Sequence, residues 1–276
     1  MDDRSLRQDL IDRLSRTGVL FDARVRAAML AAPRHRFIPA VPLTDAYDDR
    51  AIAIKEHNGL VLSSISQPGM IAQMLQLLDV QPGDAILEVG TGSGYNAALL
   101  ASLTGPNGSV TTVDIERDLL DTARTTLADL GISNVMAIDA SQLDVSRQFD
   151  RIVVTARADD IDDRWWRCLR DGGTIVVPLD IGYGGERAVG FVRHGNELRS
   201  TRSYACAFIG MRSDREESHR ESDIFFPNRN ARSEPALAHA PLAITAVERS
   251  TAQASIIEGA DVVVARPVSI FAIRAL

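Results

Sequence analysis

Three glycines at alternating positions constrain the fold of this chain more than any other feature. They follow an apolar run at 85–89 that carries Glu88 near its end, and they are Gly90, Gly92 and Gly94. Glycine lets a backbone adopt positive φ and approach a ligand closely. The pattern predicts a β-strand, a tight turn and a helix whose N-terminus faces a ligand. A dinucleotide fingerprint needs a glycine where this chain has Tyr95, which indicates a ligand without a pyrophosphate.

Two further acids end later strands. Asp114 closes an apolar segment at 110–114, about twenty residues past the glycines, where a doubly wound fold places a carboxylate over a ribose. Asp139 ends a segment at 135–138, where a side chain can accept a hydrogen bond from an adenine amino group. Each could instead cap a helix. With Glu88, however, three acids lie at or near the ends of successive strands, which favours a nucleoside ligand.

Strand and helix patterns alternate from residue 84 onward. Strands are predicted near 85–89, 110–114, 135–138, 150–155 and 173–178, with a clear helix near 116–130. Alternation of this kind predicts an α/β fold with a mostly parallel sheet and helices on both faces. Strand-like pieces at 187–193 and 203–209, joined through Gly195, predict an antiparallel hairpin.

The composition pattern divides the chain into segments. Residues 1–211 are predicted to form the main domain, with residues 1–60 as an N-terminal helical cap and residues 63–66 as a polar loop. Residues 212–235 are dense in polar residues and are expected to form a linker or an exposed insertion. Residues 236–276 turn apolar again and predict a small C-terminal extension, too short for a core of its own. The extension should dock on the main domain, pair with another chain, or begin something longer.

Charge and cysteine usage exclude several functional classes. The net charge is −7 and no block of Lys or Arg occurs, so a nucleic-acid partner is not expected. No apolar run reaches membrane-spanning length, and the charged, amphipathic start is not a signal peptide. Cys168 and Cys206 have no metal-ligand spacing. These features predict a cytoplasmic protein without a metal centre or a membrane contact.

A loop ahead of the glycine turn resembles a known family. Residues 64–70 read S-I-S-Q-P-G-M, which is similar to the T/S-I-S-x-P loop of protein-L-isoaspartate O-methyltransferases. Further blocks follow in the family's order, and the resemblance covers roughly residues 4–210. These blocks lie at 36–39, 46–49, 87–95, 153–156 and 171–178.

The resemblance implies a Rossmann-like class I S-adenosylmethionine-dependent methyltransferase with a seven-stranded sheet. It implies S-adenosyl-L-methionine as cofactor and S-adenosyl-L-homocysteine as product. The acceptor is a peptide or protein carrying isoaspartate or aspartate, and the methyl ester then collapses to a succinimide. Ser66 carries over as the active-site serine, Asp114 as the ribose acid and Asp139 as the adenine-side acid. The full cofactor set is Ser64, Ile65, Gln67, Glu88, Gly90, Thr91, Gly92, Ser93, Gly94, Asp114, Ile115, Asp139 and Ala140.

The chemistry of such a reaction explains why no His/Asp or Cys/His constellation is needed. A carboxylate is already ionised at neutral pH, so the enzyme mainly aligns the reactants and excludes water. Ser66 could hold the acceptor carboxylate by one hydrogen bond. Its local alternative is an N-cap for the helix that begins at Pro68, and both roles can hold together.

Departures from the family pattern leave alternatives open. The G-D-G block is here Ile138-Asp139-Ala140, Arg157 stands where the family has a small residue, and the chain continues beyond residue 211. These features favour a dedicated aspartate O-methyltransferase for a ribosomally synthesised modified peptide, such as a lanthipeptide, graspetide or lasso precursor. Arg157 is either a solvated charge or an attractor of an acidic peptide. A non-catalytic S-adenosylmethionine-binding module is the alternative from another class.

Overall fold

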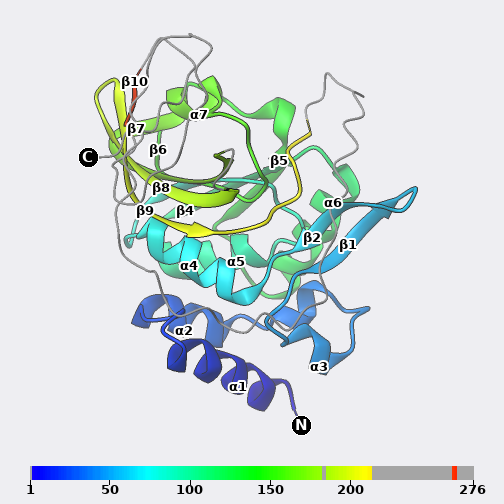
Figure 1. Cartoon of the computed structure of the whole chain (residues 1–276). Coiled ribbons are helices and arrows are strands. Elements are labelled where there is room, and N and C mark those ends of the chain that lie inside the picture. Colours follow the sequence, from blue (N-terminus) through cyan, green and yellow to red (C-terminus); the bar gives the residue numbers. More distant parts are fainter. Residues whose placement is uncertain (1, 182–184, 213–262, 266–276) are drawn as a thin grey trace.

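The chain folds around one large twisted sheet (Figure 1). A computed structural model describes residues 2–181, 185–212 and 263–265. The eight strands lie in the order β10-β9-β8-β7-β6-β3-β4-β5. Strands β5, β4, β3, β6 and β7 run parallel, and β8, β9 and β10 add antiparallel neighbours. Their bounds are β3 Ala85–Val89, β4 Ser109–Asp114, β5 Val135–Asp139, β6 Phe149–Val154, β7 Leu169–Asp180, β8 Glu186–His194, β9 Glu197–Ala205 and β10 Val263–Ala265.

The predicted α/β class is confirmed, and the parallel strands end together. Val89 pairs with Val113 on one side and with Val154 on the other, and Asp114 pairs with Asp139. The carboxyl ends of four strands therefore meet at one edge. The sheet holds one strand more than the expected seven, because β10 pairs with the outer edge of β9.

Helices cover both faces of the sheet. Successive residues of a strand point to opposite faces, so Ile86 joins a cluster with α1, α2, α4 and α5, while Leu87 joins one with α7. The helices are α1 Asp3–Arg16, α2 Ala23–Ala31, α3 Leu43–Ala46, α4 Pro68–Leu78, α5 Tyr95–Thr104, α6 Arg117–Asp129 and α7 Asp163–Cys168, with short 3₁₀ turns η1 Arg34–Phe37 and η2 Ala140–Gln142.

The N-terminal region contains a hairpin besides the expected helices. Strands β1 (Ile52–His57) and β2 (Leu60–Ile65) pair across an Asn58-Gly59 turn, where both residues have positive φ, and project from the body (Figure 1). The prediction of a polar loop over 63–66 was therefore wrong for residues 63–65. A backbone ladder supplies the stabilising bonds there, whatever the polarity of the serines.

The end of the sheet corrects a second boundary. The hairpin of β8 and β9 turns at Gly195 and Asn196, and β9 begins at once with Glu197, where the sequence predicted a strand over 203–209. A two-residue turn leaves no room for a gap before the second strand. Residues 206–212 then leave the sheet. The predicted linker and C-terminal extension lie outside the described residues, apart from Arg212 and β10.

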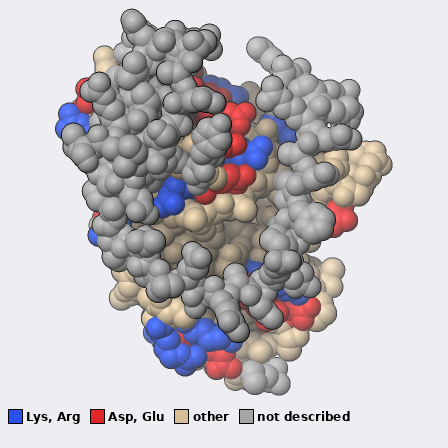
Figure 2. Space-filling view, in the orientation of Figure 1, with Lys and Arg blue, Asp and Glu red and all other residues tan. Residues whose placement is uncertain are grey.

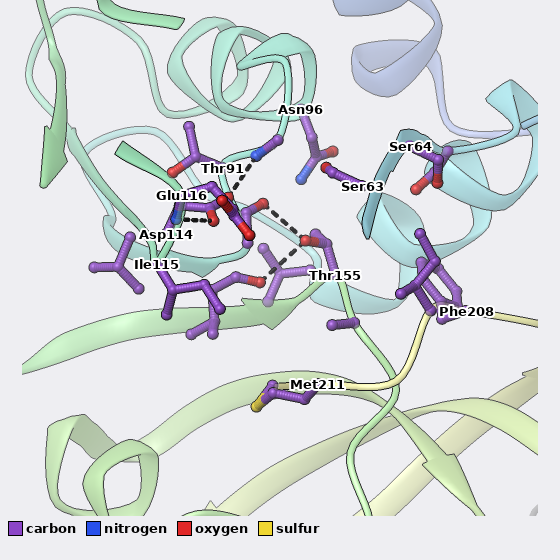
Figure 3. A pocket seen from close by; sticks show the side chains of 18 of the residues that line it. Ser63, Ser64, Thr91, Asn96, Asp114, Ile115, Glu116, Thr155, Phe208 and Met211 are labelled. Carbon is purple, nitrogen blue, oxygen red and sulfur yellow. Dashed lines mark hydrogen bonds between the residues drawn. The ribbon is translucent and has the colours of Figure 1, made fainter. Parts of the chain in front are cut away.

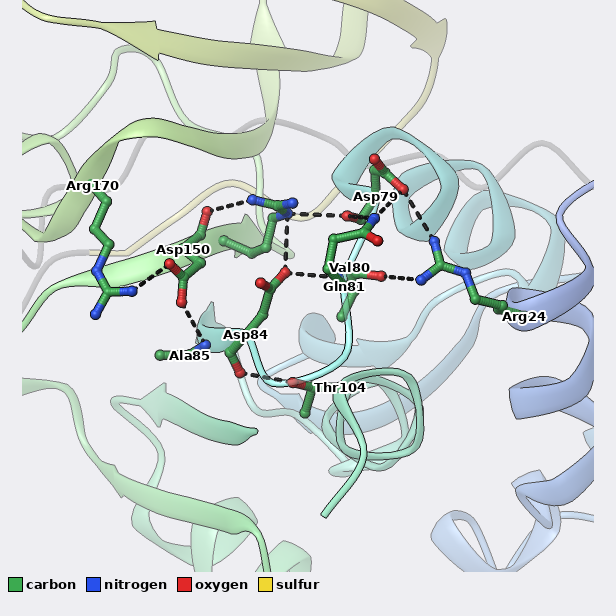
Figure 4. A network of polar contacts seen from close by, with 10 residues as sticks. Arg24, Asp79, Val80, Gln81, Asp84, Ala85, Thr104, Asp150 and Arg170 are labelled. Carbon is green, nitrogen blue, oxygen red and sulfur yellow. Dashed lines mark hydrogen bonds and ion pairs between the residues drawn. The ribbon is translucent and has the colours of Figure 1, made fainter. Parts of the chain in front are cut away.

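The amino edge of the sheet is tied together by polar contacts (Figure 4). Arg151 pairs with Asp84 at 3.3 Å and donates to the carbonyl oxygen of Asp79 at 3.1 Å. Asp150 accepts from the backbone N–H of Ala85 at 2.8 Å and pairs with Arg170. This edge is thus occupied by contacts between protein groups, whereas a cavity lies at the opposite edge.

The described surface mixes both signs of charge. Lys and Arg side chains stand among Asp and Glu side chains on the face shown in Figure 2, around a hollow of uncharged residues. Pairs such as Arg50–Asp45 at 2.9 Å and Arg26–Asp12 at 3.0 Å belong to this pattern. Among the described helices, none has the length and apolarity that crossing a bilayer requires.

Candidate active site

A pocket of about 520 Å³ lies at the carboxyl edge of the parallel strands (Figure 3). Asp114 and Ile115 lie at one end of it, while Ser64 and Phe208 lie at the other. Most of the predicted site residues line this pocket: Ser64, Ile65, Ser66, Gly90, Thr91, Gly92, Ser93, Asp114, Ile115 and Ala140. The other predicted residues, Gln67, Glu88, Gly94, Asp139 and Arg157, are not in its lining.

The glycine turn needs its first glycine for two reasons. Gly90 has φ of 100°, and a Cβ atom there would lie 2.3 Å from the hydroxyl oxygen of Thr155. That hydroxyl donates to the carbonyl oxygens of Val89 and Gly90, at 3.0 and 2.8 Å. Thr155, from the end of β6, therefore packs directly on the turn and holds it open towards the pocket.

Asp114 is fixed at the pocket wall by backbone donors. Its Oδ2 accepts from the N–H of Gly92 at 2.9 Å, and its Oδ1 accepts from the N–H of Glu116 at 3.0 Å. An ionised carboxylate offers about four acceptor positions, so two remain for further donors. The side chain is thus oriented in advance for a ligand that carries hydroxyl groups.

Glu88 lies behind the lining of the pocket and contacts the lining side chains. It is fully buried and accepts hydrogen bonds from the Thr112 hydroxyl at 2.6 Å and from the Asn96 amide at 2.8 Å. Burial raises the pKa of Glu88 to about 7, although both hydrogen bonds oppose the shift. Asn96 lines the pocket, as does Thr91, which bonds to Thr112 at 2.8 Å. Glu88 therefore positions lining side chains.

Asp139 caps a helical turn, which is the alternative to the adenine-side role that the sequence left open. Its Oδ1 accepts from the backbone N–H and the hydroxyl of Ser141, at 3.0 and 2.6 Å, so it caps η2. Its Oδ2 pairs with Arg117 at 3.1 Å. Hydrogen bonds from Ser141 and Arg117 lower the pKa of Asp139. Its neighbour Ala140 lines the pocket in its place.

Ser66 stands between two cavities. It lines the large pocket and also an adjoining cavity of about 390 Å³, which Gln67 and Met70 line from the same side. The N-cap of α4 is Gln67, so the prediction that Ser66 caps this helix was wrong. Among the described residues, the Ser66 side chain has no hydrogen-bond partner. Its hydroxyl is therefore available to a ligand.

Asp49 supports the turn that carries Ser66. Its Oδ1 accepts from the N–H of Gly69 at 2.7 Å, and its Oδ2 accepts from the Gln67 amide at 3.1 Å. The turn from β2 into α4 is thus held by a residue of the preceding segment. Gln67 is engaged in this support and faces the smaller cavity, which explains its absence from the large pocket.

Arg157 fits neither of its two predicted roles. Its Nη1 pairs with Glu186 Oε1 at 3.0 Å, and its side chain is only 24% exposed. Its guanidinium also lies against Gly210, where a Cβ atom would stand 3.1 Å from Nη2. It is neither a solvated surface charge nor a free cation in the pocket, because Glu186 neutralises it.

Several lining residues were not predicted. Glu116 lines the pocket and pairs with Lys55 of β1 at 2.5 Å and with Arg212 at 2.6 Å. Burial raises the pKa of Glu116, but hydrogen bonds from Lys55 and Arg212 outweigh it and lower the pKa. The acid two residues past Asp114 was the available signal. Lining residues from outside the predicted set also include Leu62, Asn96, Leu143, Thr155, Trp165 and Phe208.

Comparison with known proteins identifies the family of this chain. Residues 4–216 match the model of the family described as protein-L-isoaspartate(D-aspartate) O-methyltransferase. The chain is 35% identical over 212 residues to a protein-L-isoaspartate O-methyltransferase of Methanopyrus kandleri, covering 75% of this chain and 92% of that protein. A relative of the same name from Pyrobaculum arsenaticum is 35% identical over 207 residues, which cover 74% of this chain and 98% of that protein.

Solved structures agree in fold. A protein-L-isoaspartate O-methyltransferase matches with a TM-score of 0.67 at 27% identity, over 75% of this chain and 66% of that longer chain, slightly less than two thirds. A Plasmodium falciparum chain given the same enzyme name, in complex with S-adenosyl-L-homocysteine, matches with a TM-score of 0.65 over 75% of this chain and 98% of its own. That second likeness, at 23% identity, concerns the fold. The chain belongs to the protein-L-isoaspartate(D-aspartate) O-methyltransferase family.

Proposed function

We propose that the chain is an S-adenosyl-L-methionine-dependent protein carboxyl O-methyltransferase that methylates the side-chain carboxylate of isoaspartyl or aspartyl residues. The observation that carries this function is the place of Ser66. Its hydroxyl, which has no hydrogen-bond partner in the part of the chain that the structure describes, stands at the wall between a pocket of about 520 Å³ and a second cavity of about 390 Å³. Two reactants held in the two cavities would meet at this side chain.

The large pocket fits the cofactor. Asp114 would accept hydrogen bonds from ribose hydroxyls, since two backbone donors already orient its carboxylate. Apolar side chains beside it, Ile115 and Leu143, would contact the purine. The remaining cradle is the glycine turn and the Ser66 loop, which contribute Ser64, Ile65, Gly90, Thr91, Gly92, Ser93 and Ala140. When bound, the cofactor supplies a methyl group on a sulfonium, which is a good leaving group.

The residues of the chain contribute alignment. A carboxylate acceptor is ionised at neutral pH and needs no general base. Holding two reactants in line can contribute about 7–11 kcal/mol in favourable cases. Ser66 Oγ would donate one hydrogen bond to one acceptor oxygen and leave the other oxygen free to attack the methyl carbon. The β1–β2 hairpin, through Leu62 and Ser63, walls the pocket and excludes water.

The smaller cavity is the place for the acceptor. Its lining is uncharged and includes Ala51, Ser66, Met70 and residues 206–209 after β9. A neutral cavity accepts a peptide chain whose charge is confined to the reacting carboxylate. The resulting methyl ester would collapse to a succinimide, which reopens partly to normal aspartate, so the proposed role is repair of isoaspartyl proteins.

Dedicated tailoring of a modified precursor peptide is less well supported. Arg157 favoured that alternative as a cation near the site, but its charge is paired with Glu186. The altered adenine-side block favoured it too, but Asp139 caps η2 there. The residues after 212 lie largely outside the described part of the chain, so they add nothing to this alternative.

A methyl-transfer assay tests the proposed function. Radiolabelled S-adenosyl-L-methionine is incubated with an isoaspartyl peptide and with its aspartyl twin of the same sequence. Base-labile methyl incorporation into the isoaspartyl peptide is expected. Calorimetry with S-adenosyl-L-homocysteine runs in parallel. Binding without methylation of either peptide or of a cyclised precursor peptide would show a non-catalytic module, and methylation confined to the cyclised precursor would show tailoring.

A further inference from the structure

The segment that follows β9 forms part of both cavities. Residues 206–211, here called the strap, line the smaller cavity through Cys206, Phe208 and Ile209. Phe208, Ile209 and Met211 also line the large pocket, where Figure 3 shows Phe208 and Met211 on its border. The strap lines the smaller cavity together with Ser66 and Met70. The position of the strap therefore sets the width of the space beside Ser66.

Two residues hold the strap through their backbones. The N–H of Arg157 donates to the carbonyl oxygen of Ile209 at 2.9 Å, and the N–H of Met211 donates to the carbonyl oxygen of Arg157 at 2.8 Å. The N–H of Cys206 donates to the carbonyl oxygen of Glu186 at 3.0 Å. The strap is thus attached at one end to β8 and at the other to the residues after β6.

The side chains of Arg157 and Glu186 connect the two ends at which the strap is held. Glu186 Oε2 accepts from the N–H of Phe208 at 2.8 Å, while Glu186 Oε1 pairs with Arg157 Nη1 at 3.0 Å. The two side chains are 20% and 24% exposed, so the pair is partly shielded from water and from salt. The guanidinium of Arg157 lies against Gly210, where a Cβ atom would stand 3.1 Å from Nη2, so the guanidinium would have to shift to admit a side chain there.

We infer that the Arg157–Glu186 ion pair is a positioning device that sets the acceptor cavity by clamping the strap that lines this cavity together with Ser66. The inference rests on the proposed function and names what fixes the acceptor site of that reaction. Neither residue lines either cavity, so both act through the strap. The pair controls the fit of the peptide, and it does so without supplying a charge to it.

Three variants and one control test the pair in the full chain. Arg157→Gln removes the ion pair, Glu186→Ala removes both the pair and the Phe208 hydrogen bond, and Arg157→Lys keeps the charge. Glu197→Gln is the matched control, because it breaks a pair of the same length, 3.0 Å to Arg199, at the start of β9. Steady-state methylation of an isoaspartyl peptide gives KM and kcat for each protein.

The expected result is selective for the acceptor. Arg157→Gln should raise the peptide KM about fivefold and Glu186→Ala about tenfold, the size of one or two lost polar contacts, with kcat changed less than twofold. Arg157→Lys should restore most of the KM, and Glu197→Gln should match the parent protein. A purely structural pair would instead lower the melting temperature and leave KM unchanged in the folded protein. An unchanged KM in both folded variants would overturn the inference.

A second measurement separates this inference from the proposed function. Backbone hydrogen exchange of the Phe208 and Met211 amides needs no turnover. Both should exchange faster in Glu186→Ala and Arg157→Gln than in Glu197→Gln. If the parent protein methylated no peptide, the proposed function would fail, and exchange would still decide whether the pair holds the strap. Unchanged exchange in both variants would overturn the clamp itself.

Discussion

The carboxylate of Asp114, at the end of β4, accepts a hydrogen bond from the backbone N–H of Gly92 at 2.9 Å. The acid of one strand and the glycine turn of its neighbour are thereby locked together before any ligand arrives. The pocket wall is preorganised by this contact, so binding need not spend free energy on ordering the carboxylate.

Replacing Asp114 with asparagine should weaken cofactor binding. Asparagine keeps the shape but loses the charge that strengthens hydrogen bonds to ribose hydroxyls, which costs more than about 1 kcal/mol, or about fivefold in Kd. Calorimetry with S-adenosyl-L-homocysteine measures the change. Asp144→Asn is the control, since Asp144 bonds to Ser146 in an exposed turn. Equal affinities for the two variants would contradict the ribose role.

Replacing Ser66 with alanine should reduce turnover with little effect on stability. The hydroxyl neither caps α4 nor has a partner among the described residues, so its loss leaves the fold intact. A lost hydrogen bond to a charged acceptor is worth about 1.5–3 kcal/mol, so kcat should fall by roughly tenfold or more. Methyl-transfer kinetics and thermal denaturation check both parts. A lower melting temperature with normal kcat would assign Ser66 to the fold.

Replacing Asp139 with alanine distinguishes its two roles. The carboxylate serves Ser141 and Arg117, so cofactor affinity should stay within about twofold while the protein becomes less stable, because alanine cannot cap η2. Calorimetry and urea denaturation measure the two quantities. A marked loss of cofactor affinity with normal stability would restore the adenine-side role.

Replacing Glu88 with glutamine should change how stability depends on pH. The pKa of Glu88 is raised to about 7 by burial, above the value of an unfolded glutamate. Between about pH 4.5 and 7 the folded state holds more protons, so the free energy of unfolding falls as pH rises, by about 3 kcal/mol in total. Glu88→Gln lacks this group and should show a flatter profile. Urea denaturation across that range measures both, and parallel profiles would refute the raised pKa.

Replacing Glu116 with glutamine should speed cofactor release. Glu116 lines the pocket and pairs with Lys55 of the hairpin and with Arg212, so its loss frees the hairpin and the segment around Arg212. Pairs of this exposure are worth up to about 1 kcal/mol, which gives up to about a fivefold faster dissociation rate. Stopped-flow release of S-adenosyl-L-homocysteine measures it, with Asp45→Asn as a control at the Arg50 pair. An unchanged rate would show that these contacts do not retain the ligand.

Four of the five parallel strands could be predicted from the sequence almost to the residue, whereas β7, predicted over 173–178, extends further at both ends, from Leu169 to Asp180. Strands β3 to β6 begin or end within one residue of the predicted segments. Parallel strands buried on both faces are continuous apolar runs, and the glycine turn fixes where the first one stops. The bounds of the edge strands were harder to predict. β9 is mostly polar and β2 includes Ser63 and Ser64, so the extent of both strands depends on their pairing partners, which a local pattern does not contain.

The site residues divide in the same way, into those fixed by local sequence and those fixed by distant partners. Residues of the glycine turn and Asp114 line the pocket as expected, because a strand end and a turn fix them locally. The partner of Arg157 stands 29 residues away and that of Lys55 stands 61 away, so no spacing rule could pair them. Asp139 shows a different limit. An acid after a strand suits a ligand or a cap equally well, and the neighbouring Ser141 decided the outcome.

The close approach of Arg157 to Gly210 makes the residues allowed at these two positions depend on each other. A Cβ atom at position 210 would stand 3.1 Å from the guanidinium of Arg157, so a larger residue there requires the arginine side chain to shift by a few tenths of an ångström. In a relative with a small residue at position 157, the space of the guanidinium is empty, and a larger side chain at position 210 can occupy it. Substitutions at these two sites should therefore be correlated across descendants, each constraining what the other can become.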